Sequence, residues 1–399
     1  MYSSPKPLVS NELFLMEKKE NTYRVIVVGG DHYNTYGIVR SLGEEGIKSD
    51  VLILGSKSKD SFVLRSRYVE TGFGCVTHDE AITNLKNYYG DDGKNIVICC
   101  SDEAEELVLD HYDELSMRFV LPVCNEYKET ARLMNKDAIT ELARQYGIQV
   151  PETWKVLNRK MPAGIKYPCI TKPMTSTSGH KDDIVVCKCE EELRAVVEDG
   201  NRCADFIVQE YIEYEKEISI LGTMLANGEL RLSGCIDKLR TCMIGTTSFG
   251  VMVDNSLLED NVTKLEKMLK STGYRGLFSA EFLMKGDKFY FLEVNFRNDG
   301  NTYVATASGQ NLPLQYVQSI VGGERKNNGP TYPCFFMLEI EDFITLRHNH
   351  VSLGQWRRDL RKAKVCLVFN KLDIKPFRKK TRRTIVSTMQ RAWHKLAFI

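Results

Sequence analysis

The sequence predicts a mixed fold, in which a small parallel α/β unit precedes an α+β segment with a largely antiparallel sheet. Near the start of the chain, the apolar runs 25–28, 51–54 and 95–100 alternate with helical patterns, which is typical of parallel sheets. Between residues 169 and 295, short apolar runs outnumber helical stretches and are separated by turn residues. The last 45 residues are strongly basic and predict a separate extension.

Length and composition exclude several classes of protein. The 399 residues allow two or three domains, and a charged fraction of 27% is ordinary for a globular chain, so collagen-like and disordered classes are excluded. No stretch approaches the ~20 apolar residues that cross a bilayer, and the first 20 residues lack the apolar run of a secretory signal. The 12 cysteines are scattered, often within apolar runs, as reduced thiols would be. We therefore expect a cytoplasmic protein.

The first apolar run ends at Gly29-Gly30, and a helical pattern follows. The glycine doublet suggests a dinucleotide site, but the GxGxxG spacing is absent and no acid follows the second run at Leu54. We expect a close-packed turn here.

The middle of the chain begins with a helical pattern over residues 127–148 and continues as an α+β segment. Turn residues at Asn227-Gly228 and Gly286-Asp287 predict hairpins, and a second helical stretch covers residues 261–271. The predicted strands lie in residues 169–171, 184–187, 206–209, 218–225, 230–236, 276–283 and 288–296.

A pair of predicted strands carries the first cluster of polar side chains. Glu293 and Asn295 alternate along one strand and so point to the same face, and Arg297 follows on that face. A hairpin through residues 285–288 would bring Glu281 beside them. Two carboxylates and an amide oxygen make the kind of site that holds Mg²⁺ against phosphates, and Arg297 could clamp a phosphate oxygen. An exposed sheet face with ordinary salt bridges is the alternative.

A second cluster begins where Lys172 ends an apolar run and the loop 175–183 follows, rich in hydroxyls. An ammonium group and backbone N–H groups at such a loop can hold phosphates. A polar hairpin loop without a ligand is the alternative.

A third cluster lies in residues 207–220, where a strand leads to Glu210-Tyr211-Ile212 and four acids lie within eight residues. Such a hinge could pair its backbone with an adenine edge while an acid accepts ribose hydroxyls. A charged turn between two strands is the alternative.

Together, in this order and spacing, the three clusters resemble the ATP-grasp superfamily over residues 21–323. The resemblance implies a Rossmann-like pre-grasp domain (21–125), an ATP-grasp domain (126–325) with a lid subdomain at about 155–212, and a C-terminal extension (326–399). It also implies a ligase that joins a carboxylate to an amine through an acyl phosphate, with ATP and Mg²⁺ as cofactors and Mn²⁺ as an alternative metal.

The resemblance also assigns roles to individual residues. The phosphate-binding set is Lys136, Lys172, Ser178 and Gly179; the adenine hinge is Glu210, Tyr211 and Ile212; Glu217 would bind ribose; Glu281, Glu293 and Asn295 would bind magnesium; and Arg297 would stabilise the transferred phosphoryl group.

Two departures from the family pattern stand out. The lid loop has the single glycine Gly179, and Asn295-Phe296-Arg297 replaces the usual Asn-Pro-Arg, a form similar to D-aspartate ligases of the cell envelope. Lys238 and Arg240 are candidate clamps for a substrate carboxylate, with solvated strand residues as the alternative.

Positive charge is concentrated in the C-terminal extension, and the rest of the chain is acidic. Residues 355–399 hold 14 Lys and Arg but only two acids, a net charge of +12, which leaves −11 for the rest of the chain although the whole carries +1. The apolar residues of 384–399 recur at helical spacing beside cations, which is typical of segments that bind an anionic membrane surface. A helix docked on the acidic body is the alternative, and the absence of a recognised motif disfavours nucleic acid.

Three interpretations of function therefore remain open. The first is a cytoplasmic ligase for small-molecule carboxylates and amines, an amino acid among them. The second is a ligase for cell-envelope or capsule precursors, peripheral at the inner face of the membrane. The third is a catalytically silent nucleotide-binding protein, and a homodimer is compatible with each.

Overall fold

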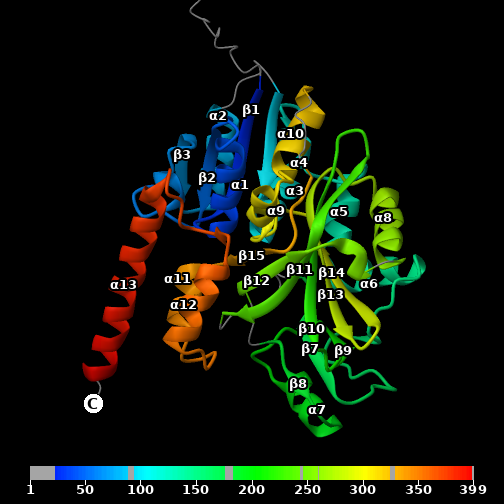
Figure 1. The fold of residues 1–399 in the computed structure, drawn as a ribbon. Coiled ribbons are helices and arrows are strands. Elements are labelled where there is room, and N and C mark those ends of the chain that lie inside the picture. The colour runs from blue at the N-terminus through cyan, green and yellow to red at the C-terminus, as the bar shows by residue number, and fades with distance from the viewer. Residues whose placement is uncertain are drawn as a thin grey trace, which may run out of the picture.

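Three β-sheets organise the part of the chain that the computed structural model describes (Figure 1). That part comprises residues 23–88, 94–175, 183–242, 246–258, 260–323 and 329–397. The mixed α/β architecture predicted from the sequence is confirmed: a parallel sheet comes first, and two largely antiparallel sheets follow.

The first sheet has five parallel strands in the order β3-β2-β1-β4-β5. Its apolar runs are buried because helices cover both faces. The order reverses between β1 and β4, so their carboxyl ends flank a crevice, the usual place for ligands in such sheets. The strands are β1 (Tyr23–Gly30), β2 (Ser49–Leu54), β3 (Val69–Cys75), β4 (Lys94–Cys99) and β5 (Phe119–Val120), and the helices α1 (Tyr33–Gly43), α2 (His78–Tyr88), α3 (Asp102–Asp110) and α4 (Tyr112–Leu115).

Gly29, at the end of β1, occupies a close-packed position, as expected from the sequence. A Cβ atom at Gly29 would lie 2.8 Å from both the Cβ atom of Cys100 and the Oγ1 atom of Thr35. The glycine therefore lets β1 approach its neighbours closely.

The second sheet is antiparallel, with the order β6-β9-β7-β8, and it projects at the bottom of Figure 1 with helix α7 (Glu190–Glu198). Helices α5 (Tyr127–Leu133) and α6 (Lys136–Gln145) precede it. Its strands are β6 (Thr153–Val156), β7 (Cys169–Pro173), β8 (Val186–Cys187) and β9 (Phe206–Glu210).

The third sheet has seven strands in the order β14-β13-β10-β11-β12-β15-β16. Both predicted hairpins are present, and their turns contain Gly228 and Gly286 at positive φ (82° and 57°), where glycine avoids the clash of a Cβ atom. The strands are β10 (Lys216–Met224), β11 (Leu230–Thr241), β12 (Thr247–Val253), β13 (Gly276–Lys285), β14 (Lys288–Asn295), β15 (Cys334–Met337) and β16 (Val365–Cys366), accompanied by α8 (Asp260–Thr272), α9 (Thr302–Ser308) and α10 (Leu312–Val321).

The C-terminal segment is continuous with this third sheet, because β15 and β16 form its last two strands. Three helices complete the segment: α11 (Glu339–Ile344), α12 (Leu353–Lys362) and α13 (Ile374–Ala397). The two acids of residues 355–399 are both buried against the body: Asp359 binds Arg240, and Asp373 accepts hydrogen bonds from Ser66 and from the backbone of Arg67.

The long helix α13 follows the outer edge of the molecule in Figure 1. Its first half is held by ion pairs from Lys380 to Glu341 (2.6 Å) and from Arg383 to Asp31. The side chains of residues 391–397, together with residues 398–399, lie outside the described part of the chain. None of the described helices combines the length and the apolar character that a membrane span requires.

Candidate functional site

The hairpin of β13 and β14 brings the predicted carboxylates together. Glu281 pairs directly with Glu293 across the two strands, and Ser279 pairs with Asn295. Side chains that pair across antiparallel strands lie about 5 Å apart at Cβ, so the two carboxylates share one face. This is the arrangement that the alternation in the sequence predicts.

Lys136 meets this face from helix α6. It is the first residue of the helix, behind the N-cap Asn135, and its backbone N–H donates to the carbonyl of Met174 at 2.9 Å. Its ammonium group forms an ion pair with Glu293. Burial alone would raise the pKa of Glu293, but the charge and hydrogen bond of Lys136 outweigh it and hold that pKa low. Glu293 is therefore ionised at neutral pH.

Lys238 meets the same face from β11, where it lies between two acids. Its ammonium group donates to Glu217 on β10 and to Glu281, 3.4 Å away. Burial raises the pKa of the Glu281 carboxyl, and the charge of Lys238 only partly offsets that effect. The two carboxyls of the hairpin thus differ in proton affinity because their lysine contacts differ.

Lys172 contributes a cation from the second sheet. It lies on β7, and its ammonium group donates to the side-chain oxygen of Gln209 on β9 at 2.8 Å. Burial and the nearby charge of Lys136 lower the pKa of Lys172 to about 8. Its hydrogen-bond partner is thus a neutral amide, while the more distant carboxylates of Glu293 and Glu281 only partly offset the lowering of its pKa, which suits a group that binds an anion.

The predicted hinge follows β9. Backbone hydrogen bonds fix the start of this hinge. The N–H of Glu210 donates to the carbonyl of Glu152 at 2.8 Å, and the N–H of Tyr211 donates to the carbonyl of Pro168 at 3.1 Å. Ile212 is buried. Glu217 lies further along, at the start of β10, where it contacts Lys238.

Arg297 connects the hairpin to the first sheet. Its Nε atom donates to the carboxylate of Asp102 at 2.5 Å, and its Nη2 atom lies 3.1 Å from the side-chain oxygen of Asn295. Asp102 begins α3 directly after β4, next to the crevice between β1 and β4. Sequence reasoning missed this acid, although a carboxylate that follows a strand at the reversal of strand order is a recognisable signal.

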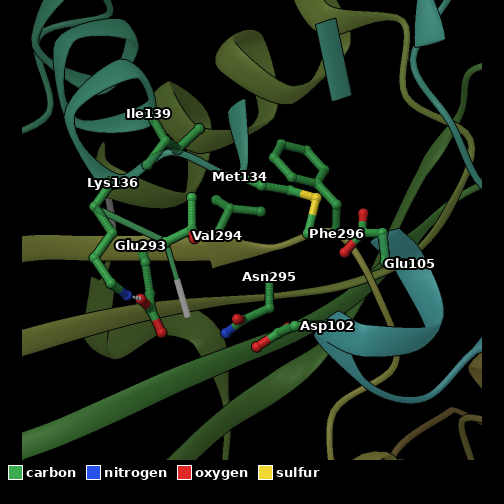
Figure 2. A pocket seen from close by; sticks show the side chains of 10 residues that line it. Asp102, Glu105, Met134, Lys136, Ile139, Glu293, Val294, Asn295 and Phe296 are labelled. Atoms are coloured by element: carbon green, nitrogen blue, oxygen red, sulfur yellow. Dashed lines mark hydrogen bonds and ion pairs between the residues drawn. The ribbon is translucent and has the colours of Figure 1, made fainter. Parts of the chain in front are cut away.

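A small cavity of about 20 Å³ lies beside four of these groups, Lys136, Glu293, Asn295 and Asp102. Figure 2 shows Lys136 and Glu293 meeting at one side of it, with Asn295 and Asp102 close to each other at the other. Its volume is close to that of one water molecule. The remaining lining residues are Glu105, Met134, Ile139, Thr175, Val294 and Phe296.

Two groups of predicted residues do not join this arrangement. Arg240 turns to the C-terminal segment, where its guanidinium binds Asp342 at 2.8 Å and Asp359 at 2.7 Å. Ser178 and Gly179 lie outside the described residues.

The oxygen donors of the hairpin fit a magnesium ion. Among the described residues, no three His, Cys, Asp or Glu side chains gather into a complete metal cage. Glu281, Glu293 and Asn295 would therefore supply part of the coordination, and phosphate oxygens and water would supply the rest, which is the usual arrangement for Mg²⁺.

Comparisons with known proteins agree with this geometry. Residues 141–313 match the model of the ATP-grasp domain. A formate-dependent phosphoribosylglycinamide formyltransferase of Wolinella succinogenes is 24% identical over 275 residues, which cover 64% of this chain and 68% of that protein. A D-aspartate ligase of Enterococcus faecium is 23% identical over 330 residues, which cover 75% and 77%.

Solved structures show the same fold. An N5-carboxyaminoimidazole ribonucleotide synthetase in complex with ADP superimposes with a TM-score of 0.63 at 16% identity, covering 82% of this chain and 85% of that one. An L-amino acid ligase from Bacillus licheniformis superimposes with a TM-score of 0.57 at 14% identity, covering 75% and 74%.

Proposed function

We propose that this chain is an ATP-dependent ligase that joins a carboxylate to an amine, because residues 141–313 match the model of the ATP-grasp domain. The observation that carries the proposal is the pairing of Glu281 with Glu293, surrounded by the cations Lys136, Lys238 and Arg297. Carboxylates that gather cations in this way suit a site where a metal–nucleotide complex binds and negative charge develops.

The proposed reaction has two steps. A carboxylate oxygen of the first substrate attacks the γ-phosphorus of ATP, and the bond from that phosphorus to ADP breaks. The amine nitrogen of the second substrate then attacks the acyl carbon; inorganic phosphate leaves with the bonding pair, and the nitrogen loses a proton. An acyl phosphate is needed because a free carboxylate has no leaving group that an amine can displace.

We assign the phosphates of ATP to Lys136 and Lys172, with Ser178 and Gly179 in the lid loop, and the transferred phosphoryl group to Arg297. A metal ion held by Glu281, Glu293 and Asn295 would neutralise phosphate charge. Asp102 fixes the guanidinium of Arg297 through its 2.5 Å contact, so this cation is oriented before the substrate arrives.

The base and sugar of the nucleotide are assigned to the segment after β9. We propose that Glu210, Tyr211 and Ile212 border the adenine and that Glu217 accepts the ribose hydroxyls. Glu217 would then exchange its contact with Lys238 for the ribose.

We propose that one of the two substrates is an amino acid. Two of the similar proteins are, by their names, a D-aspartate ligase and an L-amino acid ligase. Lys238 is the proposed clamp for a substrate carboxylate. Arg240 is not proposed for that role, because Asp342 and Asp359 already bind its guanidinium.

ADP release in the presence of amino acids and candidate carboxylates tests the ligase assignment. We expect at least one pair to stimulate ADP release from ATP and Mg²⁺, with neither substrate sufficient alone. Binding of ATP without stimulation by any pair would favour a silent nucleotide-binding protein. Absence of ATP binding would exclude both functions.

The pKa of Lys172 predicts how nucleotide affinity depends on pH. Only the protonated ammonium binds phosphate, and a pKa of about 8 means that this form is lost as the pH rises through 8. The Kd of a non-hydrolysable ATP analogue should therefore rise roughly tenfold between pH 7 and pH 9. Replacing Lys172 by Arg keeps the charge at both values and should remove the dependence. The same profile in both proteins would contradict this role for Lys172.

We also propose that the protein works in the cytoplasm and reaches the inner face of the membrane through residues 355–399. Its charge supports this location, because that segment carries 14 Lys and Arg against two acids. A ligase for cell-envelope or capsule precursors would have its substrate at such a surface. A homodimer remains compatible with this proposal.

A further inference from the structure

A large groove lies in the C-terminal segment, formed by residues other than those of the candidate active site. It has a volume of about 720 Å³, within the range of ~300–1,000 Å³ that is usual for small-molecule sites. Helices α11, α12 and α13 form most of its walls. In Figure 1, α13 lies on one side and the pair α11 and α12 on the other. The residues that line it include Phe343, Ile344, Trp356, Leu360, Phe377 and Ile385.

The apolar surface of the C-terminal segment extends beyond the groove. Phe343 and Ile344 are about half exposed within it, at 48% and 55%. Leu372 (69% exposed), Leu353 (55%) and Val386 (46%) lie outside the lining. Exposed apolar area of this extent is typical of a surface that contacts a partner or a membrane.

Arginines border the groove on two helices. Arg357 and Arg361 directly follow the lining residues Trp356 and Leu360, and Arg378 and Arg382 directly follow Phe377 and Thr381. Successive residues of a helix are 100° apart, so these arginines lie beside the apolar face rather than behind it.

The bordering arginines carry uncompensated charge. All four are exposed, and none of them has an acidic partner among the described residues. The only two acids of residues 355–399, Asp359 and Asp373, are buried in contacts with the body. The groove is therefore apolar inside and cationic at its edge.

Two polar atoms of the lining have no hydrogen-bond partner within the described chain. They are the indole Nε1 of Trp356 and the hydroxyl of Thr381. The carboxylate of Glu339, by contrast, accepts a hydrogen bond from the backbone of Phe369 at 2.6 Å. Both unpaired atoms are themselves buried, so they lie beneath the surface of the groove rather than on it.

We propose that this groove binds an acyl chain of an anionic membrane lipid, with the headgroup against the bordering arginines. The apolar interior and the cationic edge together match a lipid that has an acyl chain and a negative headgroup. The inference deepens the proposed membrane location and rests on it, but it does not depend on the ligase activity.

Fluorescence quenching by brominated lipids tests the proposal. Replacing Trp154 and Trp393 by Phe leaves Trp356 as the only one of the three tryptophans. The full-length protein should float with vesicles of phosphatidylcholine and phosphatidylglycerol but not with phosphatidylcholine alone. Bromine atoms on the acyl chains should then quench Trp356, whereas unbrominated lipids of the same headgroups should not.

A pair of matched variants separates the groove from the surface around it. Thr388 lines the groove and Gln390 does not, although both are exposed on α13. Thr388→Phe places an aromatic ring inside the groove and should weaken the quenching while flotation persists. Gln390→Phe adds the same ring elsewhere and should leave the quenching intact. ADP release measured on both variants reports the ligase activity separately.

Several results would overturn the proposal. Flotation without quenching would mean that only charge holds the protein to the vesicles, and absence of flotation would remove the membrane as partner. Quenching as strong in Thr388→Phe as in Gln390→Phe would place the chain outside the groove. A dimer of the full-length protein that Thr388→Phe dissociates would assign the groove to a second copy of the chain.

Discussion

Replacing Glu293 by Gln is expected to lower the rate of ADP release at least about 100-fold, the usual cost of removing one electrostatic group from an active site. Glu293 is ionised at neutral pH because Lys136 holds its pKa low. The amide has nearly the same shape but no charge, so it loses both the ion pair and a proposed metal ligand. The rate is measured with the substrate pair that best stimulates the unmodified protein.

The control for this substitution is Glu266→Gln. Glu266 forms an ion pair with Lys270 on α8 that is largely exposed, so its loss should leave ADP release unchanged. Circular dichroism of both variants shows whether the fold persists. Near-normal ADP release from a folded Glu293→Gln protein would remove this carboxylate from the proposed machinery.

Replacing Arg240 by Met is expected to lower the free energy of unfolding by about 3–5 kcal/mol, the usual cost of leaving a buried charge without its partner. The guanidinium binds Asp342, whose side chain is 0% exposed, and Asp359, whose side chain is 10% exposed. Both carboxylates would remain buried without it. Urea unfolding measures the change, and proteolysis should cut first near α11 and α12.

Arg231→Met on the same strand is the matched control. Its ion pair with Glu229 is half exposed on both sides, at 45% and 44%, so its removal should cost only about 0–1 kcal/mol. Equal losses in the two variants would mean that the Arg240 contacts add nothing beyond an ordinary surface pair.

The hairpin at the centre of the candidate site was predictable from the sequence because its geometry is local. Alternation along β14 fixes the shared face of Glu293 and Asn295. The turn at Gly286 sets the pairing next to the loop, and a register shift between Glu281 and Phe282 then brings Glu281 opposite Glu293 rather than Leu292. The parallel first sheet was predictable for a similar reason, since its strands and helices alternate along the chain.

The partners of the cations were not predictable in this way, because they come from distant parts of the chain. Arg297 meets Asp102, which lies 195 positions away, and Arg240 meets Asp342 and Asp359, more than 100 positions away. No local pattern encodes such pairs. The role first considered for Arg240 depended on its strand alone, whereas its contacts depend on how α11 and α12 pack.

The groove of the C-terminal segment was also not predictable from a local pattern in the sequence. The sequence indicated a basic amphipathic tail within residues 384–399, but the groove also requires α11 and α12 and begins on α13 at Phe377. Its cavity exists only once three separate helices are positioned. The amphipathic pattern of residues 384–399 therefore indicates the basic character of the tail but not the position of the groove.

The ion pairs of the hairpin have a thermodynamic consequence for the order of ligand entry. Lys136 and Lys238 neutralise Glu293 and Glu281. A metal ion arriving alone would displace both ammonium groups and leave them without a partner, and a nucleotide arriving alone would take Lys136 and leave Glu293 without one. Arrival of both lets the phosphates take Lys136 while the metal takes the carboxylates, so each ligand should raise the affinity of the other by the same factor. Lys238 is then left for a substrate carboxylate. The site is thereby selective for the metal–nucleotide complex over either component.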